Sequence, residues 1–304
     1  MNPYYKDFSE YMKELYPGIK VQKLSIDAGF TCPNRDGSIG TGGCIYCNNA
    51  SFTPGYCSPK DSIETQILKG KEFFRRKYPE MKYLAYFQSY TNTFGKSCDR
   101  LIKMYEKASE IEDVVGVIIG TRPDCLPEDL LEGLADLNKK KRIIVEIGAE
   151  TSFLHTLQLI NRNHTWDDVE KAVYRLNDKG IRTGLHLIAG LPGEDSGHVL
   201  ATVRQACRLP IDSIKMHQLQ IVKETILHRK WETGEIELTP YTLEEYLDLC
   251  VKIINEVPRH ICIERFLASS PPDMVIAPKW GLKNYQFTNL LMNKLKYKDP
   301  HHGL

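Results

Sequence analysis

Three cysteines near the start of the chain have the types and spacing of a soft-metal site. Cys32, Cys44 and Cys47 form a C-x11-C-x2-C arrangement on a glycine-rich loop. Thiolates are the ligands that zinc and iron-sulfur centres prefer, and glycines let a loop approach such a centre closely. A structural zinc site normally has four ligands at short spacing, whereas this loop supplies three. Three thiolates therefore favour a four-iron cluster with one iron open to another ligand.

Other interpretations of these cysteines stay open at this point. The gap of 11 residues between Cys32 and Cys44 does not exclude Cys32 as a ligand, because closing a loop of 11 residues rather than about 3 costs only about 1 kcal/mol. Cys57 could nevertheless replace Cys32 as the third ligand, since spacing alone does not exclude that set of cysteines. We prefer Cys32 because it directly follows a predicted strand, where functional loops begin in parallel α/β folds. The loop could also hold structural zinc, or its thiols could be buried without any ligand.

Composition limits the remaining possibilities. The chain has 304 residues, nine cysteines and a net charge of +1. An odd cysteine count without an export signal argues against a disulfide framework and favours the cytoplasm. No apolar run approaches the roughly 18 to 20 residues that span a bilayer, so no membrane partner is expected. The cysteines outside the loop are expected to pack in the core: Cys98, Cys125, Cys207, Cys250 and Cys262.

Alternating strand-like and helix-like segments must position the loop. Segments rich in Val, Ile and aromatic residues are typical of strands, and the spacing between most of them leaves room for one helix. The alternation predicts parallel strands with right-handed crossovers, in a doubly wound sheet or a barrel, and six units are too few for a closed eight-stranded barrel. The six predicted strands are 20–28, 82–89, 114–120, 142–149, 181–190 and 212–221.

Capping residues predict where three of the helices begin. Ser58, Thr165 and Thr242 are each followed three residues later by an acidic residue, which is the pattern of an N-cap. After Thr165 the apolar residues repeat at helical spacing until Lys179 and Gly180 end the pattern.

The cysteine loop resembles that of the radical S-adenosylmethionine (SAM) superfamily. In that superfamily three cysteines ligate a 4Fe-4S cluster whose fourth iron chelates SAM, and an aromatic residue commonly precedes the third cysteine, as Tyr46 does here. The first gap departs from the commonest spacing, C-x3-C-x2-C. Later segments resemble the elongator-type and coproporphyrinogen-dehydrogenase groups, and the chain resembles the compact bacterial YtqA/YhcC-type family related to elongator's catalytic subunit: 119–124, 145–151, 161–164, 184–194 and 215–220, with Thr225.

The resemblance implies a fold, cofactors and a reaction. The expected fold is α/β, a partial (β/α)6 barrel of TIM type, with a lead-in over 1–19, a radical SAM core over 20–267 and a basic C-terminal extension over 268–304. The expected cofactors are a 4Fe-4S cluster, ligated by Cys32, Cys44 and Cys47, and SAM. An electron from the cluster would cleave SAM into methionine and a 5′-deoxyadenosyl radical, with flavodoxin or ferredoxin as the electron donor.

The resemblance also implies roles for residues at strand ends. Glu146 and Arg162 would contact the ribose and carboxylate of SAM, or else form halves of buried ion pairs. Gly190 and Gly193 would pass the backbone close to the adenine, or simply form a turn. Arg122, His186, Lys215 and His217 are expected to point into one basic lumen. No catalytic residue is assigned, and the expected cofactor contacts are Tyr46, Gln88, Ser89, Glu146, Arg162, His186, Gly190, Gly193 and His217.

The relation to elongator indicates tRNA, and within tRNA the carbon-5 side chain of the wobble uridine. Lysines of the C-terminal segment support this, with aromatic residues between them on which unpaired bases could stack. A small-molecule substrate, as in coproporphyrinogen dehydrogenase, is one alternative. A zinc-stabilised RNA-binding module without radical chemistry is another. The basic and aromatic residues concerned are Lys279, Lys283, Lys294, Lys296, Lys298, Tyr285, Phe287 and Tyr297.

Overall fold

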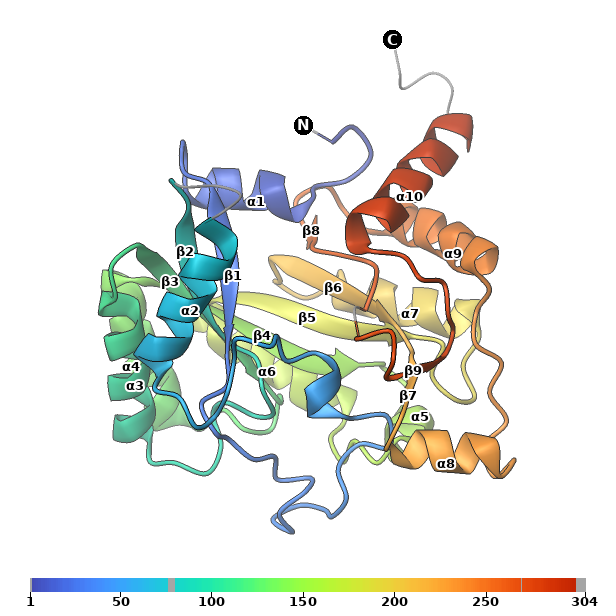
Figure 1. Ribbon diagram of the computed structural model, residues 1–304, viewed down its shortest axis with the longest axis horizontal. Helices are drawn as coiled ribbons and strands as arrows, with labels where there is room; N and C mark the ends of the chain where they lie inside the picture. Colours follow the sequence, from blue (N-terminus) through green and yellow to red (C-terminus); the bar gives the residue numbers. More distant parts are fainter. Residues whose placement is uncertain (1, 76–79, 269, 299–304) are drawn as a thin grey trace.

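The computed structural model describes residues 2–75, 80–268 and 270–298. Seven parallel strands form one curved sheet, in which each strand lies beside the next along the chain (Figure 1). The six predicted strands are confirmed, and the seventh, β8, was missed because two residues carry no recognisable pattern. The strands are β1 (Val21–Ile26), β2 (Lys82–Phe87), β3 (Val114–Thr121), β4 (Arg142–Glu150), β5 (Arg182–Ala189), β6 (Ser213–Gln218) and β8 (Cys262–Ile263).

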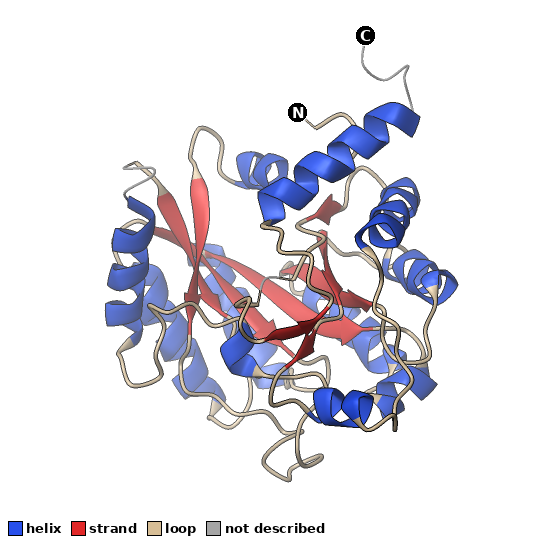
Figure 2. Cartoon of the chain, turned by 45° about the vertical axis from the view of Figure 1, so that its right-hand side comes forward, coloured by secondary structure: helices blue, strands red, loops and turns tan. Residues whose placement is uncertain are grey.

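Six helices pack on the convex face of this sheet, and the functional groups lie on its concave face (Figure 2). The outer helices are α2 (Ile63–Arg75), α3 (Cys98–Glu110), α4 (Glu128–Lys140), α6 (Trp166–Asp178), α7 (Ser196–Ala206) and α9 (Leu243–Glu256). Short elements lie near the carboxyl ends of the strands: η1 (Asn49–Ser51), α5 (Leu154–Leu159), α8 (Ile226–Glu232) and an antiparallel pair of β7 (Ile221–Val222) with β9 (Val275–Ala277). The expected partial α/β barrel is therefore confirmed.

Two of the three predicted helix starts are confirmed. Thr165 and Thr242 form complete capping boxes at the starts of α6 and α9. The prediction for Ser58 is wrong. Residues 58–61 close a turn, in which the Asp61 amide donates to the Ser58 carbonyl. The helix α2 begins only at Ile63. Its first turn is capped by Ser62, whose Oγ accepts from the Thr65 amide at 3.0 Å.

The helix α1 (Phe8–Leu15) closes one end of the half-barrel. Its buried face packs against apolar side chains on the concave side of the sheet: Tyr11, Met12 and Leu15 against Leu84, Ile118 and Ile144. Figure 1 shows α1 at the upper end of the strands and the loop after β1 at the lower end. The concave face is thus filled with apolar side chains at the amino ends of the strands and left to polar groups toward their carboxyl ends.

The C-terminal helix α10 (Asn284–Lys298) packs beside α9. Phe287 is 1% exposed and packs with the rings of Trp280 and Tyr246 in one aromatic cluster. Lys294 forms ion pairs with Glu244 and Asp248 of α9. The expectation that Phe287 and Lys294 form part of an RNA-binding surface is therefore wrong, because both side chains bind α10 to the core.

The remaining C-terminal residues differ in exposure. Tyr285 and Tyr297 are exposed on α10, as is Lys296. The side chain of Lys298 and the segment 299–304 lie outside the described residues. The spare cysteines pack as expected: Cys125, Cys250 and Cys262 are buried, and Cys98 and Cys207 pack against the core from its edge. Within the described residues, no helix has both the length and the apolar character that crossing a membrane requires.

We expect Phe287→Ala to lower the free energy of unfolding by about 3 to 5 kcal/mol, because it removes a fully buried ring and leaves a cavity between α9 and α10. Urea denaturation followed by tryptophan fluorescence measures this change. Tyr285→Ala, in the same helix but with an exposed side chain, is the control and should change the midpoint little. Equal effects of the two substitutions would contradict this account of α10.

Candidate functional site

The cysteine loop is held on both sides by the core. Ile45, between Cys44 and Tyr46, is buried in a cluster with α5, β7 and α8. Its amide donates to the carbonyl of Ile160 at 3.0 Å, and its carbonyl accepts from the amide of Leu227 at 2.8 Å. The backbone beside the Cys44 and Cys47 thiols is therefore fixed by elements more than 100 residues away in the chain.

The first half of the loop is tied to the segment after α5. The Asn34 side-chain nitrogen donates to the backbone carbonyl of Asn161. The Oδ1 of Asn34 accepts from the side-chain amide of Asn163 at 2.9 Å. Gly43 has a φ of +80°, and a Cβ there would lie 2.8 Å from the Arg35 side chain. Glycine is required at this position because both the backbone conformation and the space exclude a side chain.

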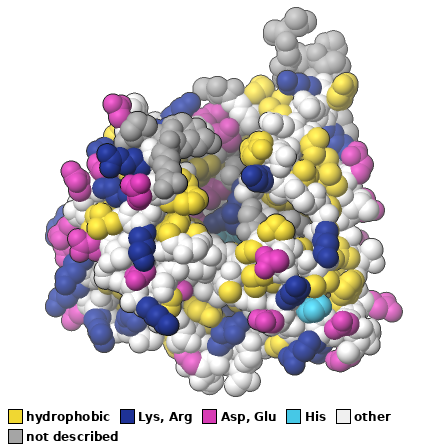
Figure 3. Space-filling view, in the orientation of Figure 1, with side chains coloured by type: hydrophobic (Ala, Val, Ile, Leu, Met, Phe, Trp, Pro, Cys, Tyr) yellow, Lys and Arg dark blue, Asp and Glu magenta, His cyan; other side chains and the backbone are white. Residues whose placement is uncertain are grey.

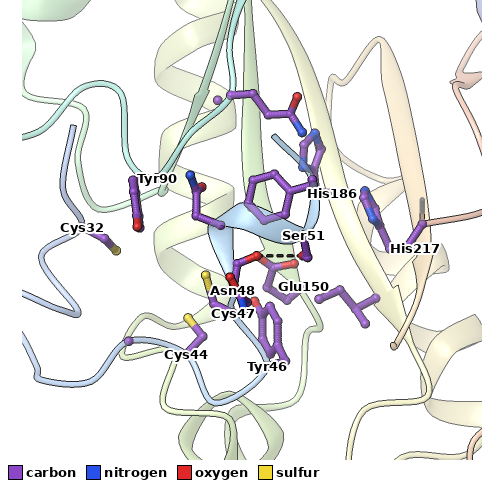
Figure 4. A pocket seen from close by; sticks show the side chains of 18 of the residues that line it. Cys32, Cys44, Tyr46, Cys47, Asn48, Ser51, Tyr90, Glu150, His186 and His217 are labelled. Atoms are coloured by element: carbon purple, nitrogen blue, oxygen red, sulfur yellow. Dashed lines mark hydrogen bonds between the residues drawn. The ribbon is translucent and has the colours of Figure 1, made fainter. Parts of the chain in front are cut away.

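The three predicted cluster ligands line one end of a cavity of about 240 Å³. All three are free thiols, and Figure 4 shows Cys44 and Cys47 together, with Cys32 further away across the space. No three His, Cys, Asp or Glu side chains of the described residues lie as the ligands of one metal ion would. Cys57 does not line this cavity, and its thiol donates to the carbonyl of Ser25 at 2.8 Å. Burial raises the pKa of the Cys57 thiol to about 12.

Two guanidinium groups lie beside the cysteines: Arg35 donates to the Cys47 carbonyl at 2.8 Å, and Arg162 lies beside Cys44. One guanidinium nitrogen of Arg162 lies 3.7 Å from the Cys44 Sγ, and another donates to the carbonyl of Gly148 at 2.6 Å. The Nε donates to Nε2 of His164, and Glu150 forms an ion pair at 3.3 Å. Burial and the Arg162 charge lower the pKa of His164 to about 3, so His164 is a neutral acceptor.

Arg122 lines the cavity but is satisfied by the protein. Its guanidinium forks onto the carboxylate of Asp124 at 2.8 and 2.7 Å and donates to the carbonyl of Arg162 at 2.9 Å. Burial opposes ionisation of Asp124, but the bonds and charge of Arg122 outweigh it and hold the pKa of that carboxyl below its usual value. Arg122 therefore positions the Arg162 backbone.

Glu146 on β4 is the centre of a buried polar network across the concave face. Its carboxylate accepts from Lys23 at 2.5 Å, from Tyr86 at 2.7 Å and from His186 at 2.6 Å. Lys215 lies 3.2 Å from the same carboxylate. The residues paired with Glu146 on both neighbouring strands are glycines, Gly120 and Gly184, which leave room for this side chain.

The pKa shifts within the network follow from burial and pairing. Burial disfavours the Glu146 carboxylate, but the charges of Lys215 and Lys23 outweigh it, so the pKa of Glu146 lies well below its usual value. Burial and the charge of Lys215 lower the pKa of His186 to about 4, so its ring is neutral. Burial lowers the pKa of Lys215 to about 8, despite the attraction of Glu146.

The structure brings most of the predicted residues to this one cavity, which Figure 3 shows as a hollow holding charged side chains. Ser89 is buried, Gly190 faces Tyr241, and Gly193 has no neighbour within 4 Å at its Cβ position. These three do not line the cavity. The predicted residues that line it are Cys32, Cys44, Tyr46, Cys47, Gln88, Arg122, Glu146, Arg162, His186, Lys215 and His217.

Sequence reasoning missed several polar residues of the site. Lys23 and Tyr86 lie at positions of β1 and β2 that face the same side of the sheet as Glu146, and the alternation of strand side chains could have identified them. Glu150 ends β4 with a φ of +66° at an irregularity in the ladder, which no local pattern predicts. Glu264 and Arg265 follow β8, whose two residues gave no signal.

Comparisons with known proteins point to one family. A family model described as the radical SAM superfamily matches residues 35–206, and one described as the radical SAM C-terminal domain matches 211–297. YtqA of Bacillus subtilis is 32% identical over 299 residues, covering 98% of this chain and 92% of YtqA. YhcC of Escherichia coli is 36% identical over 264 residues, covering 86% of this chain and 83% of YhcC.

More distant matches carry names that mention tRNA. A tRNA uridine(34) acetyltransferase of Methanocaldococcus jannaschii is 26% identical over 204 residues, which cover 64% of this chain but only 36% of that protein. The structure of Elp3 from Methanocaldococcus infernus superposes with a TM-score of 0.66 at 18% identity, covering 92% of this chain and 64% of Elp3. The latter likeness shows a shared fold.

Removal of Glu146 should destabilise the protein severely. We expect Glu146→Leu to lower the free energy of unfolding by about 3 to 5 kcal/mol, because Lys23 and Lys215 would remain buried without their shared carboxylate. Chemical denaturation provides the measurement. The control is Glu128→Leu, which removes an exposed carboxylate paired with Arg175 and Lys179 and should leave the midpoint nearly unchanged. Similar losses in both variants would count against the network.

Proposed function

We propose that this chain, which belongs to the radical SAM superfamily, modifies the carbon-5 side chain of the wobble uridine in tRNA. Its cofactors are a 4Fe-4S cluster and SAM, which supply the electron and the 5′-deoxyadenosyl radical when bound. The substrate in this proposal rests on the match to tRNA uridine(34) acetyltransferases. Because the chain spans only 36% of the Methanocaldococcus jannaschii protein, the acetyl transfer in that name is not carried over.

Cys32, Cys44 and Cys47 are the proposed cluster ligands. The support is that the three free thiols line one cavity, with donors from Asn34 and Arg162 close to the Cys44 sulfur. Burial and the nearby Cys44 raise the pKa of Cys47 to about 11, so three bare thiolates would be unfavourable here. The positive charge of iron would offset the cost of placing three thiolates close together. This set of sulfur donors is therefore suited to a metal cluster.

Arg162, Tyr46 and Glu150 are the proposed contacts to SAM near the cysteines. A guanidinium suits a carboxylate, and a carboxylate suits hydroxyl or ammonium groups. Burial raises the pKa of Glu150, although Arg162 and a hydrogen bond from Tyr46 oppose this. The carboxylate of Glu146 is already bonded to Lys23, Tyr86 and His186, so a ribose contact there would require one of those bonds to be exchanged.

The barrel's own contribution is position and exclusion of water. A carbon radical abstracts hydrogen from any nearby C–H, so selectivity requires that one carbon is held close and others are kept away. The cavity is lined by the strands on one side and by the cysteine loop and β7 on the other. We propose that the target base enters this cavity from a single-stranded loop, which is the part of tRNA whose bases are accessible.

The exposed residues of α10 provide a surface for the rest of the RNA. Lys296, Tyr285 and Tyr297 remain exposed after the burial of Phe287 and the pairing of Lys294. Lysines attract phosphates and aromatic rings stack on unpaired bases. We propose a cytoplasmic enzyme that receives its electron from a flavodoxin or a ferredoxin, because the cluster must be reduced by one electron from outside the chain.

We expect Cys32→Ala to abolish cluster assembly, because it removes one of three iron ligands. Iron and acid-labile sulfide, measured after anaerobic reconstitution, report the cluster directly. Cys57→Ala should retain both, since Cys57 lies outside the cavity. The reverse result would transfer the site to Cys44, Cys47 and Cys57, and zinc without sulfide in the unmutated protein would refute radical chemistry.

The substrate can be tested by comparing modified nucleosides in bulk tRNA from cells with and without this protein. We expect one derivative of the wobble uridine to be lost or its precursor to accumulate, and the Cys32→Ala variant to fail to restore the normal pattern. Unchanged nucleosides in cells lacking the protein would reject tRNA and favour a small-molecule substrate.

A further inference from the structure

Arg265 stands out in the cavity because its charge has no carboxylate partner. It lies two residues after β8, and its carbonyl accepts from the Met216 amide at 3.0 Å, which fixes it beside β6. Its Nε is buried without a hydrogen-bond partner, and a terminal nitrogen lies 3.3 Å from Nε2 of His217. Within the part of the chain that the structure describes, no carboxylate forms an ion pair with this guanidinium.

The charges around Arg265 do not balance. Lys23, Lys215 and Arg265 bring three positive charges, and Glu146 and Glu264 bring two carboxylates, which Lys23 bridges. Burial and the proximity of Glu146 raise the pKa of Glu264, so its negative charge is the weaker of the two. At least one positive charge is therefore left over, and it faces the cavity that Lys215 and Arg265 line.

The nearby histidines do not add to this charge. Burial and the charge of Arg265 hold the pKa of His217 well below its usual value, and burial lowers the pKa of His186 to about 4. The two rings lie 5.7 Å apart and are neutral at physiological pH. They are polar walls beside the surplus charge, able to donate or accept a hydrogen bond.

This corner of the cavity is distinct from the cysteine end. Figure 4 shows His217 and His186 on the opposite side of the cavity from Cys32, Cys44 and Cys47. Arg162, which we assign to the SAM carboxylate, is 3.7 Å from Cys44. Cationic groups therefore face the space from both ends of the cavity, and one cofactor carboxylate cannot occupy both ends.

We propose that Arg265, Lys215 and His217 form a binding site for a carboxylate of the reacting substrate, either borne by the target nucleotide or supplied as a free small carboxylate. The inference rests on the proposed function in taking this cavity as the place of reaction. A guanidinium forks onto a planar carboxylate, and the single negative charge of a carboxylate matches the one surplus positive charge near Arg265. A phosphate carries about 1.5 to 2 negative charges at neutral pH, which is more than the surplus positive charge.

The site should depend on pH through Lys215. Its ammonium faces Tyr86 and Glu146 across the sheet, with Lys23, Glu264 and Arg265 nearby, and burial lowers its pKa to about 8. At pH values well below 8 the charge that attracts the carboxylate is present, and as the pH rises through about 8 this charge is lost from the free protein. Affinity is therefore expected to be level well below pH 8 and to fall as the pH rises through about 8.

The experiment is calorimetric titration of the reconstituted protein, kept anaerobic, with acetate as the probe. We expect acetate to bind, neutral acetamide of the same shape not to bind, and inorganic phosphate to bind more weakly than acetate. Arg265→Gln should weaken acetate binding at least tenfold, because a charged hydrogen-bonded pair is lost. Arg100→Gln, on the exposed face of α3, is the matched control and should leave it unchanged.

A second variant protects the test against misfolding. Arg265→Lys keeps the charge balance but removes the fork, and we expect a severalfold loss of acetate affinity with an unchanged unfolding midpoint. Equal binding of acetate and acetamide, or acetate binding unaffected in both Arg265 variants, would overturn the proposal. Stoichiometric displacement of acetate by SAM would also overturn it, because the site would then belong to the cofactor's carboxylate.

Competition with tRNA identifies the source of the carboxylate. If bulk tRNA displaces acetate, the carboxylate is borne by the nucleotide, and if the two bind together, it is a free co-substrate. Acetate binding could depend on Arg265 even if cells lacking the protein show unchanged tRNA nucleosides. That pair of results would retain the carboxylate site and reject only tRNA as the substrate.

Discussion

The burial of charge on the concave face of the sheet is the constraint on which the site depends. Glu146 is 1% exposed, and a bare carboxylate at that depth would be strongly unfavourable. Donors from four other strands compensate it: Lys23, Tyr86, His186 and Lys215. Each of these side chains is fixed in turn by bonding to the same acceptor. The inner wall is therefore a preorganised polar surface, held in place by the cost of leaving any one member unpaired.

A second constraint acts on the cysteine loop, which has little regular structure of its own. Ile45 anchors it in a small apolar cluster that lies apart from the main core, and Asn34 ties its first half to the segment around Asn161. These contacts join the loop after β1 to the loops after β4 and β6. The thiols, Arg162 and Glu150 consequently meet at one end of the cavity, although about 100 residues separate them in the chain.

Local patterns predicted elements well where one interaction dominates. The strands of the sheet follow from runs of apolar residues. The capping boxes of Thr165 and Thr242 follow from a hydroxyl residue with an acidic residue three positions later. Ser58 has the same pattern but closes a turn, because Ser62 provides a competing cap. Phe287 was taken for a surface ring, since nothing in the sequence of α10 reveals that Trp280 and Tyr246 cover it.

The sequence by itself indicated the chemistry of this protein: three thiols on one glycine-rich loop, an alternating α/β chain, and polar residues at the ends of its strands. Those features are local, so they can be read from neighbouring residues. Only the tertiary structure decided which charges meet and which remain unpaired. Arg265 gains its significance from Lys215 and His217, which lie on β6 about 50 residues earlier in the chain. Charge balance in a cavity depends on distances in space, and these are set by the register of the strands.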